Sequence, residues 1–179
     1  MKNNVFSFLS VLAVLIACNN KDEIKKTDID FTATANTVKL PYKASYSTSF
    51  NNNVSDSDLL AVLNSYKHWE TGDMNALRGT LADSIAVDGA DTFKFNGRAD
   101  SLIKIWGRYR DSLSSVTINI SVWLKNHELK DSSNFINVWY NEIDTYKSGK
   151  VDSANYADIN MVKNGKIVWY SQFKQKPKP

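Results

Sequence analysis

Apolar side chains recur at helical spacing in three segments near the middle of the chain. The first segment begins at Ser55, whose hydroxyl can cap a helix, and ends at Gly72; its apolar face comprises Leu59, Leu63, Tyr66 and Trp69. Asp73 is a natural cap for a second helix over 74–81. The third helix has an apolar face made of Leu102, Trp106, Tyr109 and Leu113. The spacing therefore predicts three consecutive helices from residue 55 onwards.

Strand patterns surround and follow the third helix. Two short strands at 85–87 and 92–95 are expected around a turn at Gly89, with Asn96-Gly97 ending that hairpin. A period of two then places one set of apolar residues on a single face: Val116, Ile118, Ile120, Val122 and Leu124. After a polar loop at 126–134, further strands are expected at 135–146, 151–162 and 167–174, the last two joined by an Asn164-Gly165 hairpin. This order predicts an α+β fold with a curved antiparallel sheet wrapped around the helices.

The beginning of the chain has a different pattern. Lys2 precedes an apolar run of 13 residues at 5–17, which is shorter than the roughly 20 helical residues needed to span a bilayer. We interpret residues 1–17 as a signal peptide. Its end, Leu15-Ile16-Ala17-Cys18, resembles the lipobox of bacterial lipoproteins, and the resemblance implies cleavage before Cys18 and acylation of its thiol. The alternative is that Cys18 is an ordinary small residue of an unprocessed signal.

A polar segment separates this signal from the folded part of the chain. Residues 18–37 are expected to be a lipidated flexible tether, residues 38–54 an N-terminal extension or edge strand, and residues 176–179 a C-terminal tail. Lys21, Asp22 and Glu23 resemble the short signal by which some Gram-negative bacteria place lipoproteins on their surface. A solvated charged tether explains the same three residues. We expect a cell-envelope protein anchored by lipid to the outer membrane, with surface exposure if the tripeptide is a signal.

Composition narrows the chemistry further. The chain has 179 residues and a formal charge of +3, so no strong basic field favours nucleic acid. Its single cysteine excludes an internal disulfide. The two histidines have no metal-ligand spacing, and the sequence contains neither a phosphate-binding glycine loop nor a nucleophile elbow. We therefore expect no metal and no cofactor.

Three stretches together resemble the nuclear transport factor 2-like superfamily, in particular its SnoaL-like branch. They are Tyr66-Lys67-His68-Trp69-Glu70-Thr71-Gly72-Asp73-Met74-Asn75-Ala76-Leu77, Leu81-Ala82-Asp83-Ser84 and Asn164-Gly165-Lys166-Ile167. The resemblance covers residues 55–175 and implies a cone-shaped, cystatin-like fold: a bent sheet and three N-terminal helices enclosing a cavity open at one end. Members of this superfamily include isomerases, dehydratases, cyclases and binding modules, so the fold alone does not decide the function.

The catalytic residues of these enzymes are poorly represented here. Steroid-isomerase members use a tyrosine on the first helix, an aspartate in the first hairpin and a protonated aspartate further along. Aligned on the end of the first helix, the tyrosine position falls on Ser65, beside Tyr66, and the first aspartate position falls on Gly89, beside Asp88. Only Asp158 matches, at the position of the hydrogen-bonding acid. The histidine pair of the dehydratases is poorly supplied by two distant histidines.

Aromatic residues supply the remaining signal, because five tryptophans and eight tyrosines are many for this length. Strand parity places Tyr156, Asp158 and Asn160 on one face. If that face lines the cavity, the candidate ligand-pocket residues are Tyr66, Trp69, Trp106, Tyr156, Asp158 and Tyr170. Alternatively, the rings fill a closed core or a dimer face.

Two main functions follow from this sequence. The first is binding of a small, partly apolar ligand, or of a protein partner, without catalysis. The second is an enzyme of the cyclase, isomerase or dehydratase type, with Asp158 as general acid or base and Tyr66 or Tyr170 as its hydrogen-bond partner. A purely structural module and a homodimer are further expectations. An open cavity with two or more convergent ionisable groups would favour catalysis, and a filled one would favour interaction.

Overall fold

The computed structural model describes residues 48–175. The predicted signal peptide, Cys18, the Lys21-Asp22-Glu23 tripeptide, the tether and the C-terminal tail lie outside the described residues. Of the predicted N-terminal extension, the described part contributes strand β1 (Phe50–Asn51), which pairs with the far end of β4.

The described chain contains three helices and one seven-stranded sheet. The helices are α1 (Asp56–Thr71), α2 (Met74–Thr80) and α3 (Ala99–Arg110). The other strands are β2 (Leu81–Asp88), β3 (Lys94–Arg98), β4 (Leu113–Glu128), β5 (Asn134–Tyr146), β6 (Val151–Lys163) and β7 (Lys166–Gln175). Their order is β1-β4-β5-β6-β7-β2-β3, and every neighbouring pair is antiparallel except β2 and β7. The predicted α+β class is confirmed.

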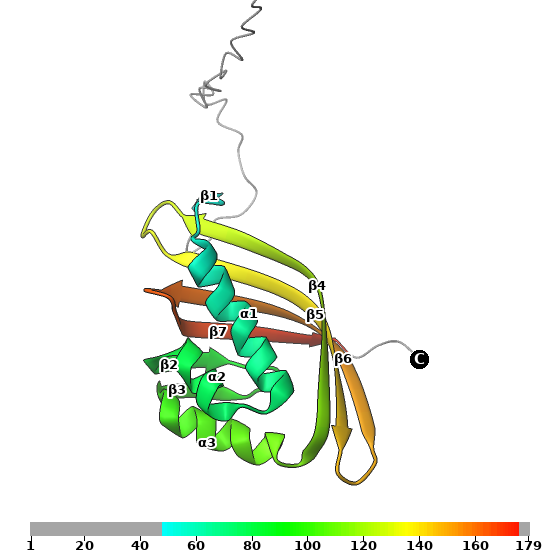
Figure 1. Cartoon of the computed structure of the whole chain (residues 1–179). Coiled ribbons are helices and arrows are strands. Elements are labelled where there is room, and N and C mark those ends of the chain that lie inside the picture. Colours follow the sequence, from blue (N-terminus) through cyan, green and yellow to red (C-terminus); the bar gives the residue numbers. More distant parts are fainter. Residues whose placement is uncertain (1–47, 176–179) are drawn as a thin grey trace, which may run out of the picture. The chain divides into compact units, whose positions relative to one another are not determined.

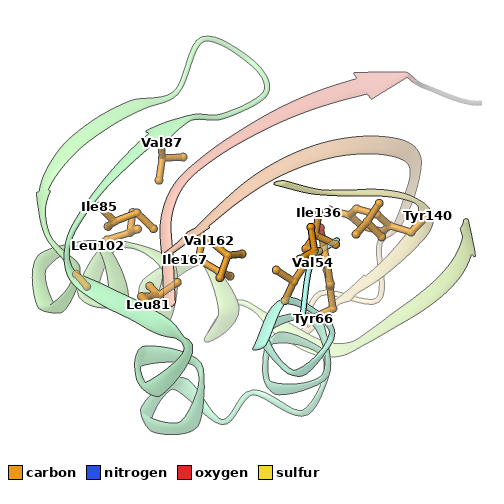
Figure 2. Close-up of a cluster of buried hydrophobic side chains, with 13 residues drawn as sticks. Val54, Tyr66, Leu81, Ile85, Val87, Leu102, Ile136, Tyr140, Val162 and Ile167 are labelled. Carbon is orange, nitrogen blue, oxygen red and sulfur yellow. The ribbon is translucent and has the colours of Figure 1, made fainter. Parts of the chain in front are cut away.

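The sheet bends around the helices, as Figure 1 shows. Helix α1 contacts the four long strands β4 to β7, while α2 and α3 pack against β2 and β3 at the other end of the sheet. Buried hydrophobic side chains fill the space between the two layers, including Tyr66 of α1, Leu102 of α3 and Ile136 of β5 (Figure 2). Burying such a side chain contributes about 1.5–3 kcal/mol, so this cluster fixes the helices on the sheet.

Helix α1 begins and ends where its sequence predicts. The Ser55 hydroxyl accepts a hydrogen bond from the Asp58 amide at 3.1 Å, which satisfies one free donor of the first turn. Gly72 ends the helix in the left-handed region, at φ 76°. Asp73 then caps α2 by accepting from the Ala76 amide at 2.9 Å. The Asn164-Gly165 hairpin is confirmed as well, with both residues at positive φ.

The ends of α1 are also tied to distant parts of the chain. Near its beginning, the buried Asp58 carboxylate accepts from Asn134 Nδ2 at 2.9 Å and from the Gly165 amide at 3.2 Å. At its other end, the Arg110 guanidinium of α3 donates to the carbonyls of Trp69 and Glu70, each at 3.0 Å. The Trp69 carbonyl also accepts from the Gly72 amide that ends the helix, and a cation is favourable at this end of the helix dipole.

Several predicted boundaries were wrong. Leu113 does not continue α3; the amides of Asp111 and Ser112 close the helix on the carbonyls of Gly107 and Tyr109, and Leu113 begins β4. Leu113 is buried in this position too, which explains why it fitted the helical face. Likewise Leu81 begins β2, where it pairs with β7, and does not end α2.

The first hairpin turns at the predicted Gly89, but its second strand, β3, begins and ends later than predicted. Asn96 and Gly97 lie inside β3 and pair with β2. Asp91 and Thr92 supply the positive φ values of the turn, at 55° and 68°. The polar loop predicted at 126–134 is shorter, because His127 belongs to β4 and pairs with Asn134 of β5.

A β-bulge changes which residues of β4 face the helices. The register shifts between Ile120 and Val122, so the strict alternation predicted for this strand is wrong beyond Ile120. Val122 lies opposite the outward-facing Trp139, and both Val122 and Leu124 are nearly half exposed, at 46% and 48%. The register extends this outer row through Ala157 to Phe173, which is 61% exposed.

We expect Gly72→Ala to lower the free energy of unfolding by about 1–2 kcal/mol, because an L side chain is strained at this positive φ. The matched control is Gly107→Ala within α3, where an added Cβ meets nothing within 4 Å. This control should raise the free energy of unfolding by about 0.5–1 kcal/mol. Urea denaturation measures both, and two changes of the same sign would contradict the assigned role of Gly72.

Candidate functional site

A cavity of about 370 Å³ lies between α1, α3 and the inner face of the sheet. This volume is within the range of small-molecule sites. Its walls are mainly aromatic and aliphatic, and they include all six residues that the sequence analysis placed in a ligand pocket: Tyr66, Trp69, Trp106, Tyr156, Asp158 and Tyr170. The rings therefore surround a space and do not fill a closed core.

Asp158 lies deep in this cavity, on β6, with only 2% of its surface exposed. Its Oδ2 atom accepts hydrogen bonds from the hydroxyl of Tyr66 on α1 at 2.8 Å and from that of Tyr140 on β5 at 3.1 Å. The sequence had named Tyr66 or Tyr170 as the partner, and the second hydroxyl comes from Tyr140. One carboxyl oxygen thus joins the helix to two neighbouring strands.

Amide groups fix the direction of these two hydroxyls. Asn160 Nδ2 donates to the Tyr66 hydroxyl oxygen at 3.3 Å, and Gln172 Nε2 donates to that of Tyr140 at 3.0 Å. Each hydroxyl oxygen accepts from an amide, so its single proton points to Asp158. Burial also raises the pKa of Tyr66 and of Tyr140 well above 10, which keeps both hydroxyls protonated. The two protons are thereby committed to the carboxyl.

The other oxygen of Asp158 has no such partner. Oδ1 is buried and accepts no hydrogen bond from any described residue. Burial raises the pKa of this carboxyl to about 7, although the hydrogen bonds from Tyr66 and Tyr140 act in the opposite direction. Near neutral pH, Oδ1 is able either to accept a hydrogen bond from a molecule in the cavity or, when protonated, to donate one.

A second carboxyl lines the same cavity. Glu142 of β5 lies beside Trp69, whose Nε1 donates to Oε1 at 3.5 Å. Burial, with added repulsion from Asp144 and Asp158, raises the pKa of Glu142 to about 8. Asp144 accepts from the Tyr109 hydroxyl at 2.8 Å, and the Tyr109 ring stacks on that of Trp69 at 6.1 Å. The cavity thus contains two acids that change charge near neutral pH.

Sequence reasoning left Tyr140 and Glu142 out of the candidate pocket. The signal that identifies them is the period of two in β5, where Ile136, Val138, Tyr140, Glu142 and Asp144 share the inner face. A glutamate in such an apolar series is unusual.

The tryptophans divide between the two sides of the sheet. Trp69 and Trp106 line the cavity, whereas Trp139 belongs to the outer row and is 38% exposed. Trp123 is also largely exposed, and Trp169 donates to Asp88 Oδ2 at 3.2 Å. The homodimer expected from the sequence, which stays a prediction, would have the outer apolar row of Val122, Trp139 and Phe173 available to it.

Two further properties of residues 48–175 bear on the site. No group of three or more histidine, cysteine, aspartate or glutamate side chains in this range is arranged to hold a metal ion. None of the helices in the same range is long and apolar enough to cross a membrane.

No family model matches this chain, and no curated protein matches it either. Solved structures do resemble it. An NTF2-like protein of unknown function from Burkholderia pseudomallei has a TM-score of 0.56 at 15% identity, over 68% of this chain and 92% of its own. An LEH-like epoxide hydrolase from M. tuberculosis has a TM-score of 0.57 at 10% identity, over 68% and 84%. A ketosteroid isomerase-like protein from Erwinia carotovora atroseptica has a TM-score of 0.54 at 16% identity, over 71% and 100%.

These likenesses define the fold as nuclear transport factor 2-like, which confirms the fold expected from the resemblance. At such low sequence identity, these likenesses do not assign a role to any residue of this chain. The chain's neighbours in this fold include an epoxide hydrolase and an isomerase-like protein as well as proteins of unknown function, so the site itself has to decide what the domain does.

We expect Asp158→Asn to become more stable relative to the wild type as the pH rises from about 4 to about 7. In the unfolded chain this carboxyl ionises near pH 4, whereas in the folded protein it keeps its proton up to about pH 7. The folded wild type therefore binds more protons in this interval, and its free energy of unfolding falls as the pH rises. Urea denaturation of both proteins at several pH values measures the difference between their free energies of unfolding. Taking this difference cancels the contribution of the other titratable groups. A difference that stays constant with pH would contradict the raised pKa.

Proposed function

We propose that this domain binds a small, partly apolar molecule in the cavity, and that the molecule presents a polar group to Asp158 Oδ1. The observation that carries this proposal is the unpaired buried oxygen itself, which belongs to a side chain that lines an aromatic cavity. Buried polar atoms are nearly always hydrogen-bonded, and an unpaired one costs about 1–3 kcal/mol. A ligand that supplies the missing partner recovers this free energy on binding.

The walls of the cavity favour an apolar body for the rest of the ligand. Ile85, Phe93 and Ile167 contribute aliphatic and aromatic surface, and the rings of Trp106 and Tyr170 meet edge to face at 6.2 Å. Apolar area removed from water contributes about 25 cal/mol per Å². Such walls supply affinity, while the few polar groups select the ligand.

General acid–base catalysis is the second candidate function, and a specific observation favours it. Asp158 and Glu142 both line the cavity, and both have pKa values raised to near neutrality. This is the arrangement expected for catalysis at the sequence level. Gly89, however, stands where the isomerase-type aspartate would be, and the Tyr66 proton is committed to Asp158. We therefore rank binding first.

A ligand should co-purify with the protein from its own host and be lost from a variant with a blocked cavity. Ala90 lines the cavity in the turn between β2 and β3, so Ala90→Trp should displace the ligand. Ser101→Trp, on the exposed surface of α3, adds the same side chain outside the cavity and should retain it. Native mass spectrometry compares the two, and a small molecule present equally in both variants, or in neither, would contradict the proposed site.

The variant Asp158→Asn then separates binding from catalysis for the identified molecule. It keeps the shape of the side chain and removes its titration. A binding protein should lose only a modest part of its affinity, whereas an acid–base enzyme should bind the molecule and no longer convert it.

We also propose that this domain is displayed on the cell envelope by a lipid anchor at Cys18. The support is the sequence of residues 1–18: a short apolar run that ends in the only cysteine of the chain. Two or more acyl chains make such an anchor stable, whereas one would be marginal.

Cys18→Ser should abolish labelling by a fatty-acid probe and leave the signal peptide uncleaved. The matched variant replaces Lys21, Asp22 and Glu23 with alanine; it should keep the label but lose accessibility to protease on intact cells. Equal labelling of Cys18→Ser and wild type would refute the anchor. Unchanged protease accessibility of the alanine variant would assign the tripeptide to the tether only.

A further inference from the structure

The charges around the cavity do not balance among the described residues that line it. Asp91, Glu142 and Asp158 are acidic, and Lys174 alone is basic. Lys174 Nζ lies 3.1 Å from Asp91 Oδ2, so these two groups compensate each other. Neither Glu142 nor Asp158 forms an ion pair within the described part of the chain. Two acids inside the cavity thus lack a cation.

Most of the hydrogen-bond donors next to Asp158 are already committed. The hydroxyl protons of Tyr66 and Tyr140 go to Asp158 Oδ2. Asn160 and Gln172 direct their amides to those hydroxyl oxygens. A ligand carbonyl or carboxylate at this point would have the Tyr170 hydroxyl, the second N–H of Gln172 or a protonated Asp158 as its donors. The unpaired Oδ1 of an ionised Asp158, by contrast, accepts a hydrogen bond directly.

Aromatic rings surround the space between the two acids. In the register of β5 and β6, the pair Tyr140 and Tyr156 lies between Asp158 and Glu142, and their rings stack at 5.2 Å. Trp69 and Tyr109 line the cavity on the helix side. Aromatic faces attract cations within about 6 Å, and more strongly where water is excluded.

We propose that the cavity binds an organic cation of the alkylammonium class, whose N–H group donates to Asp158 Oδ1 within the field of Glu142 and the surrounding aromatic rings. This inference rests on the proposed ligand-binding function and names the chemical class of the ligand. Its apolar part lies against the aliphatic and aromatic walls. One bound cation supplies both the missing hydrogen bond and the missing positive charge.

The proposal predicts a definite direction for the effect of pH. The groups that face Asp158 are Tyr66 from α1, Tyr140 and Glu142 from β5, and Tyr170 from β7. Asp144 and Tyr156 face Glu142, with Lys174 and Asp91 beyond Tyr156. Burial raises the pKa of each of the four tyrosines above its usual value, to about 12 for Tyr156, so none of them titrates below pH 9.

We therefore expect the pH dependence of cation binding between pH 5.5 and 8.5 to come mainly from Asp158 and Glu142. Each must lose its proton for its charge to attract a cation, and their pKa values are raised to about 7 and about 8. Affinity for a cation should rise by about tenfold or more across this interval, with release of protons on binding. A neutral carbonyl ligand that accepts a hydrogen bond from protonated Asp158 should show the reverse.

The experiment compares three probes that share an aromatic body: 2-phenylethylammonium, 2-phenylethanol and 4-phenylbutan-2-one. Titration calorimetry on the folded protein at pH 5.5, 7.0 and 8.5 should show the ammonium probe binding more tightly than the two neutral probes at pH 8.5. Its affinity should fall at least about tenfold at pH 5.5. Repeating the titration in buffers of different ionisation enthalpy should detect the released protons.

Two variants and a control assign the effect to the acids. Asp158→Asn should weaken the ammonium probe by about tenfold and flatten its pH dependence. Glu142→Gln should weaken it while leaving Asp158 in place, and it keeps the test decisive if the first variant does not fold. The control is Asp83→Asn, which removes an exposed acid paired with Arg78 outside the cavity and should change nothing.

If the ketone bound more tightly than the ammonium probe, and its affinity fell as the pH rose, the proposal of a cationic ligand would be overturned. The ligand-binding function would still stand. Equal effects of Asp83→Asn and Glu142→Gln on the affinity for the ammonium probe would also overturn the proposed cation site. The attraction would then not be specific to the acids of the cavity. Absence of binding by all three probes at millimolar concentration would also overturn the proposed cation site. In that case the Ala90→Trp co-purification experiment decides separately whether the cavity binds anything.

Discussion

Helix α1 has to remain packed against a sheet that bends away from it, and polar contacts hold it at three levels. Asp58 joins its first turn to β5 and to the β6–β7 hairpin, Tyr66 joins its middle to Asp158, and Arg110 holds its last carbonyls. These ties set the distance between helix and sheet. Where the sheet curves most, that distance is more than side chains fill, and the cavity results.

This constraint explains why the most buried polar group of the cavity is only half satisfied. Tyr66 reaches Asp158 from one side and Tyr140 from the same sheet, and both approach Oδ2. Oδ1 has no partner among the described residues, and its side chain lines the cavity. In surroundings of low polarity, an unpaired polar atom lowers the stability of the folded protein. Proteins retain such groups where a ligand or a reaction uses them. The stability of the protein therefore depends in part on this one atom.

Local signals in the sequence were sufficient for the parts of the fold that depend on neighbouring residues. Ser55, Gly72 and the Asn164-Gly165 turn act through caps and backbone dihedrals, which the residue types specify. That Tyr156, Asp158 and Asn160 share one face followed from the period of two in a regular strand. The sequence was thus a reliable guide wherever a single element decided the outcome.

Other features depend on contacts between elements that are distant in sequence. The bulge after Ile120 adjusts β4 to the curvature of β5, and the alternating pattern of β4 does not predict it. Leu113 satisfied a helical and a strand pattern equally, because burial is the common requirement. The period of two in β5 places Tyr140 and Glu142 on its inner face, but their closeness to Asp158 depends on the register between β5 and β6.

The parallel pairing of β2 with β7 has a consequence for how the chain folds. Strand β2 occurs early, at Leu81–Asp88, but its neighbour in the sheet is the last strand, Lys166–Gln175. During synthesis, the β2–β3 hairpin and α3 therefore lack their sheet partner β7 until the last strand of the domain has been synthesised. Such long-range closure slows folding and lengthens the time for which apolar edges are exposed. A chain cut before residue 166 should accumulate as a partly ordered intermediate, vulnerable to proteases and aggregation.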